Sequence, residues 1–406
     1  MSAGAKTAAD RLPDESWPLA PVVHWLVREG RLIATLPEFV DAVCDKLTQA
    51  GLSLWRFRIG FRTIHPQLLA MGVLWVRGSP TRLINARHGI EQSDDYVGSP
   101  IQHVFEEGEP LRRRLDRLDA TKDHGVLHSI ARAGATDYLA LPLRFSQGAV
   151  NVLILATDAP AGFADDEVND LTRFADYLAP VIEVFATRQL AVSLLETYVG
   201  PRTGQRVLQG TIKRGDGECI FAAMWFSDLR DFTPLTESLP IPELLQTLND
   251  YFELVAAAVT ARGGEILRFI GDAMLIVFPS QDESHVADAC TAALESAQDA
   301  FSALATLNHR RRRAGKPEIR FGVGLHVGEV IYGNVGAPNR LDFTVMGPAV
   351  NRTARLESLT KAVDTPLLMS AEFTRHIGVP VRSLGHHAMK GVATPQEVFS
   401  LARAFP

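Results

Sequence analysis

A helical pattern from residue 167 to 198 constrains this chain more than any other feature of its sequence. Its apolar residues recur at intervals of three and four, with Arg188 where a further seam residue is expected: Leu171, Phe174, Leu178, Val181, Phe185, Val192 and Leu195. The 406-residue chain is too long for one ordinary hydrophobic core. We therefore expect one domain on each side of this helix.

This helix has two possible partners. A repeat of about 3.5 residues is typical of coiled coils and predicts a parallel dimer stalk over 167–198, in which Arg188 fixes the register at some cost in stability. The alternative is a helix that packs on its own domain, which Pro180 favours because it kinks a helix.

Composition indicates a soluble globular protein, with 46% hydrophobic and 22% charged residues. The net charge of −6 gives no reason to expect nucleic acid as a partner. The basic run at 309–313 is interpreted as a solvated helix end.

The three cysteines and the apolar runs bear on location. Cys44, Cys219 and Cys290 are widely spaced and predict neither a disulfide framework nor a CxxC metal site, which fits the cytoplasm. No apolar run approaches the roughly 20 residues of a membrane span. We therefore expect a cytoplasmic protein with no membrane span.

The first domain is predicted over 20–166, after a disordered lead-in at 1–19. It contains an amphipathic helix at 36–51 and a hairpin at 138–157. The closing stretch LPLRFSQGAVNVLILATDAPAGFADDEVNDL resembles the end of a GAF domain, which implies an α/β sensor for an unknown ligand. Three histidines, His103, His124 and His128, are interpreted as exposed surface residues rather than a haem or metal site.

The second domain is predicted over 219–406, after a glycine-rich connector at 199–218 that is not expected to join a core. Its helices are predicted at 241–262, 283–309 and 348–359, between strand pairs. This order favours an α+β sheet with helices on one face.

Two aspartates in this domain follow apolar strands. Asp228 ends a strand in FSDLRDFTPL, and Asp272 lies at the hairpin tip of ILRFIGDAML. Two such acids can hold two Mg²⁺ ions about 3.5–4 Å apart. The alternative roles are a helix cap and a turn-forming residue.

A helix start after Asp228 predicts a phosphate site. Thr233 and Pro234 suit the N-cap and first helical positions. The backbone N–H groups around Asp231, Phe232 and Thr233 would then face a phosphate at the positive helix end.

Three basic or polar residues complete the candidate set. Asn351 and Arg355, in TVMGPAVNRTARLE, are four apart and share one helix face. Lys390 precedes a glycine turn in HAMKGVATP. Each is also compatible with an ordinary exposed surface position.

Together these segments resemble the class III nucleotide cyclases over nearly all of 219–402. The resemblance implies a ferredoxin-like α+β domain, preceded by a transducer element at 198–218. FSDLRDFT and RFIGDAML match the two metal motifs, so Asp228, Asp272 and the Leu229 carbonyl would bind the metal ions. RLDFTVMGPAVNRTARLE matches the segment that binds substrate and transition state, and AMKG matches the phosphate-binding segment.

The resemblance assigns a role to each matched residue. Thr344 would contact the purine, Asn351 would orient the ribose and Arg355 would contact the reacting phosphorus. Lys390 would hold the terminal phosphates. The implied cofactors are two Mg²⁺ or Mn²⁺ ions per site.

The implied reaction joins the ribose 3′-oxygen to the α-phosphorus of a nucleoside triphosphate and releases pyrophosphate. In this family each site is shared by two chains, so the resemblance implies a homodimer through the catalytic domain and the stalk. Asp228 and Asp272 would come from one chain, and Arg268, Thr344, Asn351, Arg355 and Lys390 from the other.

The purine is predicted from Arg268 and Thr344. Arg268 stands where adenylate-forming members usually carry lysine and guanylate-forming members glutamate. Arginine donates and cannot accept, so it suits adenine N1 and cannot pair with the guanine N1–H. We predict ATP as the substrate.

The alternatives are a guanylate cyclase and a non-catalytic dimer that only binds nucleotide. All seven matched functional positions hold chemically competent side chains, which disfavours the non-catalytic alternative. A diguanylate cyclase, suggested by GGEI at 263–266, lacks the acidic pair expected in that motif.

Overall fold

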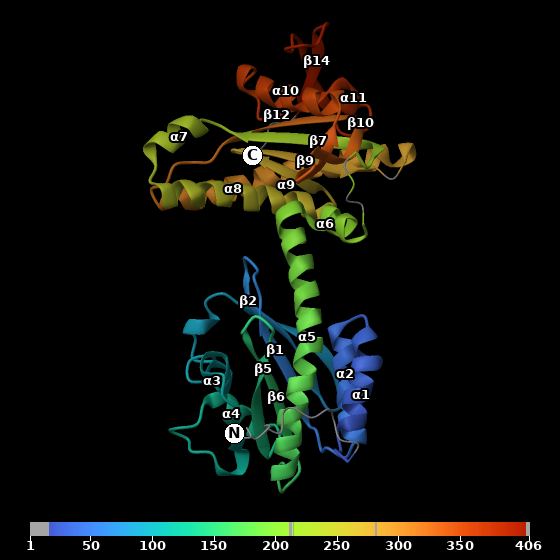
Figure 1. Ribbon diagram of the computed structural model, residues 1–406. Helices are drawn as coiled ribbons and strands as arrows, with labels where there is room; N and C mark the ends of the chain where they lie inside the picture. The colour runs from blue at the N-terminus through green and yellow to red at the C-terminus, as the bar shows by residue number, and fades with distance from the viewer. Residues whose placement is uncertain (1–15, 211–212, 214, 281, 403–406) are drawn as a thin grey trace, which may run out of the picture. The chain divides into compact units, whose positions relative to one another are not determined.

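The computed structural model describes residues 16–210, 213, 215–280 and 282–402. The chain divides into two compact units, Met1–Leu194 and Leu195–Pro406 (Figure 1). Each unit has its own sheet and its own hydrophobic core.

The first unit is built on one antiparallel sheet with the strand order β3-β2-β1-β6-β5-β4. Its strands are β1 (Arg56–Arg62), β2 (Leu68–Val76), β3 (Ser79–Arg87), β4 (Leu111–Arg114), β5 (Asp137–Arg144) and β6 (Val150–Thr157). Its helices are α1 (Ala20–Arg28), α2 (Leu36–Gln49), α3 (Pro100–Glu107), α4 (Gly125–Arg132) and α5 (Asp165–Val199), which continues into the second unit.

Alternation along the strands gives this sheet two buried faces. Phe57 and Ile59 of β1 point into a core shared with α1, α2 and α5. Tyr138 and Ile154 point to the opposite face, where they pack against α3 and α4. The predicted helix at 36–51 and the predicted hairpin at 138–157 are confirmed by α2 and by β5–β6.

The structure corrects three predictions in this unit. Trp17 and Leu19 are buried in the core, so the predicted lead-in is wrong at its end, while residues 1–15 lie outside the described part. Leu171, Phe174 and Leu178, which were predicted for a dimer seam, lie in the same core. The alternative therefore holds for the first half of α5, which packs on its own domain.

The third correction concerns the histidines. They are half-buried, not exposed: the ring of His124 accepts the N–H of Val126 and lies 2.7 Å from the Asp94 carbonyl oxygen. His124 is therefore a cap for α4.

Among the described residues, α5 is the one helix long and apolar enough, by length and composition, to cross a membrane. No membrane-spanning segment was predicted from the apolar runs of the sequence. Buried helices of soluble proteins pass the same test, but only 22% of the apolar window of α5 is buried.

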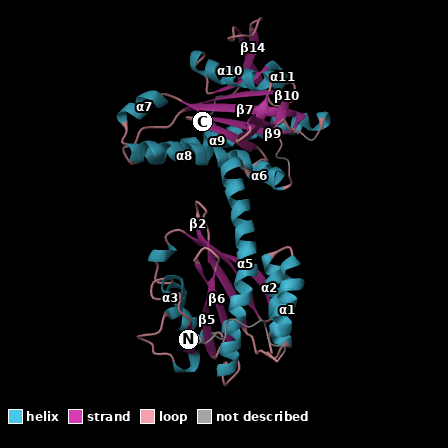
Figure 2. Cartoon of the chain, viewed as in Figure 1, coloured by secondary structure: helices cyan, strands magenta, loops and turns pink. Residues whose placement is uncertain are grey.

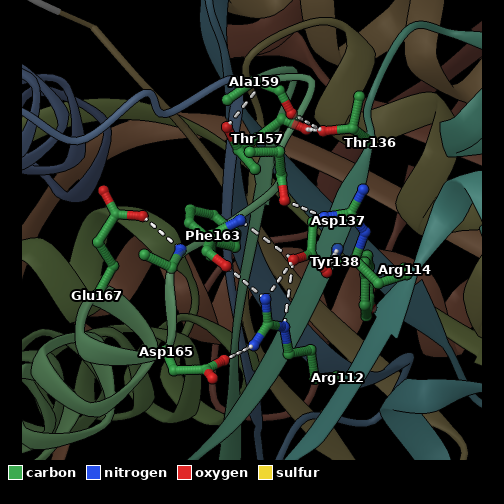
Figure 3. Close-up of polar contacts among 12 residues, drawn as sticks. Arg112, Arg114, Thr136, Asp137, Tyr138, Thr157, Ala159, Phe163, Asp165 and Glu167 are labelled. Atoms are coloured by element: carbon green, nitrogen blue, oxygen red, sulfur yellow. Dashed lines mark hydrogen bonds and ion pairs between the residues drawn. The ribbon is translucent and has the colours of Figure 1, made fainter.

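A polar cluster fixes the start of α5 (Figure 3). The buried Asp137 carboxylate accepts from Arg112 Nη2 at 2.9 Å and from the Phe163 N–H at 3.1 Å. Arg112 also pairs with Asp165 at 2.9 Å. Glu167, in the first turn of α5, accepts the N–H of Ala164, the residue just before the helix, at 2.7 Å. These bonds tie the loop before α5 to the start of β5.

The second unit has an eight-stranded sheet with the order β13-β14-β12-β10-β7-β9-β8, in which β11 also pairs with β10. Its strands are β7 (Gly217–Leu229), β8 (Glu265–Ile270), β9 (Ala273–Pro279), β10 (Phe321–Ala337), β11 (Arg340–Met346), β12 (Leu367–Ser370), β13 (Val381–His387) and β14 (Gln396–Leu401). Its helices are α6 (Pro201–Leu208), α7 (Phe232–Ser238), α8 (Ile241–Ala261), α9 (Val286–Arg313), α10 (Pro348–Ala362) and α11 (Ala371–Thr374).

Helices cover both faces of this sheet, and not one face as predicted (Figure 2). Ala223 and Trp225 of β7 point to the face covered by α8 and α9. Ala222 and Met224 point to the opposite face, where they meet Ala349 of α10. The prediction failed because α10 has a short apolar stripe that a sequence pattern does not assign to a face.

The connector is also more ordered than predicted, since it contains α6. Thr203 is buried, and its hydroxyl donates to Glu265 Oε1 at 3.0 Å. The hydroxyl of Tyr332 donates to Glu265 Oε2 at 2.7 Å. Arg206 lies over the ring of Tyr332 at 4.8 Å. The buried Glu265 carboxylate therefore anchors α6 to β8 and β10.

The basic run at the end of α9 is only partly solvated. Arg311 is 4% exposed and pairs with Asp250 at 2.8 Å. It also donates to the Pro317 carbonyl at 2.8 Å. Arg311, one of the five residues predicted as solvated, is therefore buried and links α8 to the chain after α9.

Candidate active site

Asp228 and Asp272 lie beside each other at one end of the sheet. Asp228 is the penultimate residue of β7, and Asp272 follows Gly271 in the β8–β9 turn. Because Ser227 pairs with Met274, the end of β7 reaches the tip of that hairpin. Burial and the neighbouring Asp228 carboxylate raise the pKa of Asp272 to about 6.

Three charged residues that were not predicted from the sequence lie around this pair. Lys361 Nζ lies 3.6 Å from Asp228 Oδ2. Burial and the Asp228 charge raise the pKa of the Glu357 carboxyl to about 7. Arg230 Nη1 lies 4.0 Å from Glu357 Oε1. The i, i+4 spacing of Glu357 and Lys361 was visible in RLESLTK, but their approach to β7 depends on how α10 packs.

The acid pair suits a divalent cation. Two partly buried carboxylates repel each other, and a shared cation relieves that repulsion. No group of three or more His, Cys, Asp or Glu side chains arranged for a metal occurs in the described ranges. Mg²⁺ commonly takes only one or two protein carboxylates, with water and phosphate completing its shell. Asp228 and Asp272 are thus a sufficient donor pair.

The helix start after Asp228 differs from the prediction. The N-cap of α7 is Asp231, with φ of 58°, and the helix begins at Phe232, so Thr233 is not the cap. The Asp231 carboxylate accepts from Arg320 Nη2 at 2.7 Å. The phosphate contacts of Phe232 and Thr233 stay predictions.

Three predicted substrate residues meet in one cavity of about 630 Å³. Arg268 comes from β8, Thr344 from β11 and Asn351 from α10. The Arg268 guanidinium bonds to the Asp342 carboxylate, which sequence reasoning missed. The cavity therefore offers both a donor and an acceptor to a bound base.

Arg355 and the Lys390 segment also come together. Gly391 follows Lys390 with φ of 72°, and a Cβ built at Gly391 would lie 3.1 Å from Arg355 Nη2. Lys390 is exposed, as a residue that contacts phosphate must be. The positive φ explains why glycine follows the lysine.

The candidate residues thus form separate groups within one chain. The cavity that holds Arg268, Thr344 and Asn351 is not lined by Asp228 or Asp272. Among the described residues, the metal pair and the substrate cavity therefore do not make one pocket.

The second unit matches known cyclases. Residues 218–401 match the family described as the adenylate and guanylate cyclase catalytic domain. Adenylate cyclase 1 of Rhizobium meliloti (strain 1021) is 34% identical over 182 residues, which are 43% of this chain and 26% of that protein. The adenylate cyclase of Anabaena cylindrica is 34% identical over 160 residues, which are 38% of this chain and 30% of that protein.

A solved structure of a bacterial light-regulated adenylyl cyclase is 31% identical. The match covers 46% of this chain and 93% of that one, with a TM-score of 0.41. The chain spans between 26% and 30% of the length of the two cyclases named above. The region from residue 218 to 401 belongs to the class III adenylate and guanylate cyclase catalytic domain family.

Proposed function

We propose that this protein is an adenylate cyclase, which converts ATP into 3′,5′-cyclic AMP and pyrophosphate at sites shared by two copies of the chain. The observation that carries the proposal is the Asp228–Asp272 pair at the end of β7 and the tip of the β8–β9 hairpin. The relatives named as adenylate cyclases support the choice of ATP.

The residues divide the chemistry among them. Asp228 and Asp272, with the Leu229 carbonyl, would hold two Mg²⁺ or Mn²⁺ ions. Bound metal would lower the pKa of the ribose 3′-hydroxyl and offset phosphate charge. Asn351 would orient the ribose. As the bond from the 3′-oxygen to the α-phosphorus forms and the bond to pyrophosphate breaks, Arg355 and Lys390 would meet the developing negative charge.

A second copy of the chain would complete each site. Large apolar side chains are exposed on β7, β8, β10 and β11: Phe221, Phe269, Ile270, Ile331 and Leu341. Exposed apolar surface of this kind is typical of subunit interfaces. The separation of the metal pair from the substrate cavity also favours a site shared across a two-fold axis.

The first unit would regulate the cyclase. Its closing hairpin resembles that of a GAF sensor domain, and α5 leads from this unit toward the catalytic one. The second half of α5 is only partly buried, and its exposed Val184 and Tyr198 offer surface through which the proposed stalk would pair with a second copy.

The test measures cyclic AMP and cyclic GMP formed by the full chain from equimolar ATP and GTP with Mg²⁺ or Mn²⁺. We expect mainly cyclic AMP, with activity lost on chelation and restored by Mn²⁺. Asp228→Asn and Asp272→Asn should each lower the rate roughly a hundredfold or more. Asp288→Asn, an exposed acid of α9, is the matched control and should keep full activity.

Thermal unfolding separates lost chemistry from lost fold. Because the two carboxylates repel each other, neither Asn variant should lower the unfolding temperature. Undiminished cyclic nucleotide output from both variants would instead favour the non-catalytic nucleotide-binding dimer.

Guanylate cyclase is the second candidate, and Asp342 favours it. Its carboxylate can accept from the N1–H and amino groups of guanine, which Arg268 cannot do. Cyclic GMP as the main product of the same mixture would establish this alternative.

A further inference from the structure

The first unit contains a cavity of about 720 Å³ between its sheet and the segment that carries α3 and α4. Its walls come from β1, β2, β3, β5 and β6 as well as from both helices. This volume lies within the range of pockets that hold small organic ligands. It lies within the first unit, which contains none of the cyclase motifs, so a ligand there does not depend on the proposed catalytic function.

Two arginines of β1 project into this cavity from the face that α3 and α4 cover. Arg56 and Arg58 are two residues apart on one strand and share that face. The register places Ala156 and then Tyr138 beside Arg56. Arg58 lies beside Ile154 and then the small Ala140, and Gly60 follows two residues later on the same face of β1, which leaves room for long side chains over the sheet.

Among the described residues, neither guanidinium group has a hydrogen-bond or ion-pair partner. Arg56 Nε and Arg58 Nε are buried and have no hydrogen-bond partner. In the described part of the chain, no carboxylate lies within 4.0 Å of either guanidinium group. Burial lowers the pKa of Arg58, but a guanidinium keeps its charge in proteins. The cavity therefore contains two uncompensated positive charges.

The other polar groups of the cavity do not offset that charge. Asp94 and Asp95 line it but are exposed, and neither pairs with Arg56 or Arg58. Arg62, at the exposed end of β1, lies over the ring of Phe105 at 4.9 Å and adds further positive charge. A partly buried charge without a partner is costly, and a bound ligand of opposite charge would remove that cost.

We propose that this cavity binds a small organic anion, whose carboxylate or phosphate group bonds to Arg56 and Arg58 and whose apolar body packs against the cavity walls. A guanidinium group can donate two parallel, charge-assisted hydrogen bonds to a carboxylate or to a phosphate. Apolar side chains that line the cavity provide the complementary surface: Met71, Ile84, Ile101, Phe105, Ile130 and Ile154. The buried Tyr138 also lines the cavity, and its ring adds a flat aromatic surface.

The test compares an aromatic anion with its neutral analogue on the full chain. The probes are 2-naphthoate, 2-naphthamide of nearly the same shape, and inorganic phosphate, and the readouts are calorimetric titration and the unfolding temperature. The variants are Arg56→Gln and Arg58→Gln. Arg117→Gln is the matched control, because Arg117 is exposed and does not line the cavity.

Saturable binding of 2-naphthoate or phosphate by the natural chain and by Arg117→Gln is expected, with 2-naphthamide bound far more weakly. Each cavity variant should bind the anion roughly tenfold or more weakly. Equal binding of the neutral analogue, equal affinity in the cavity variants, or no binding of either anion would overturn the proposal.

A second measurement needs no ligand. If Arg58 is held for a ligand, Arg58→Met should unfold at the same or a higher temperature in the absence of anion, because a buried unpaired charge is removed. A clearly lower unfolding temperature would show that Arg58 serves the fold, and would count against a ligand site.

Discussion

At the scale of single residues, His326 links stability to pH. It is buried in β10, and its ring Nδ1 lies 2.7 Å from Ser370 Oγ. Burial lowers its pKa to about 4, although Glu372 opposes that shift. The unfolded chain thus binds the proton more readily between pH 6.5 and about 4, so stability should fall as the pH falls through that window. The loss should total roughly 3 kcal/mol.

The measurement is thermal or urea unfolding of the full chain across that window. Other groups titrate there too, so the informative quantity is the difference between the natural chain and His326→Asn, whose stability should depend less on pH. His309→Asn, an exposed histidine of α9, should follow the natural chain. Parallel pH curves for all three proteins would contradict this prediction.

The Arg268–Asp342 pair makes a prediction about the purine. A carboxylate at position 268 would accept from the guanine N1–H and amino groups, and Asp342→Asn would remove the neighbouring like charge. We expect the double variant R268E/D342N to shift the ratio of cyclic AMP to cyclic GMP toward cyclic GMP by about tenfold or more. The single variant D342N is the control, because it removes the ion pair between Arg268 and Asp342 without adding a carboxylate at position 268. No change in the ratio would show that these residues do not contact the base.

Some of these residues could be selected from the sequence and others could not. Asp228 and Asp272 follow apolar strands within short motifs, so their roles were predictable from local pattern. Asp342 lies 74 positions from Arg268, and a pair so distant is set by how β8 meets β11. Thr233 was chosen as a cap by residue type, but Asp231 adopts the left-handed conformation that starts α7.

At the scale of elements, the position of α6 against the sheet depends on one carboxylate. Glu265 is buried and accepts from Thr203 and Tyr332. Glu265→Gln would replace a charged acceptor with a weaker one and should cost about 2 kcal/mol. Hydrogen exchange of residues 201–208 should accelerate in this variant and less so in Tyr332→Phe. Glu253→Gln, exposed on α8, is the control, and equal exchange in it would contradict the role of Glu265.

The elements themselves were largely predictable, and their partners were not. The helix at 241–262 and the hairpin at 266–275 are confirmed by α8 and by β8–β9, because their periodicity is local. The connector was assigned no core role because its glycines suggest a loop, yet Thr203 is held by Glu265 from 62 positions away. Likewise, a repeat in α5 shows that a helix has an apolar stripe but not which surface covers it.

At the scale of the whole molecule, the proposed homodimer predicts that two inactive chains complement each other. In the proposed geometry Asp228 and Arg355 reach the same site from different chains. A heterodimer of Asp228→Asn with Arg355→Gln has one site with both changes and one with neither. Random pairing makes half of the dimers mixed, so an equimolar mixture should recover about a quarter of the natural activity.

The matched control is a mixture of Asp228→Asn with Asp272→Asn. Both residues would serve the site of their own chain, so every site in this mixture has a damaged metal pair and no activity should return. Subunit exchange is checked by mixing chains that carry different affinity tags. If exchange occurs and neither mixture gains activity, or if both gain equally, the shared site is wrong. Recovery in the first mixture alone requires that the metal pair and Arg355 come from different chains, which a single-chain site cannot produce.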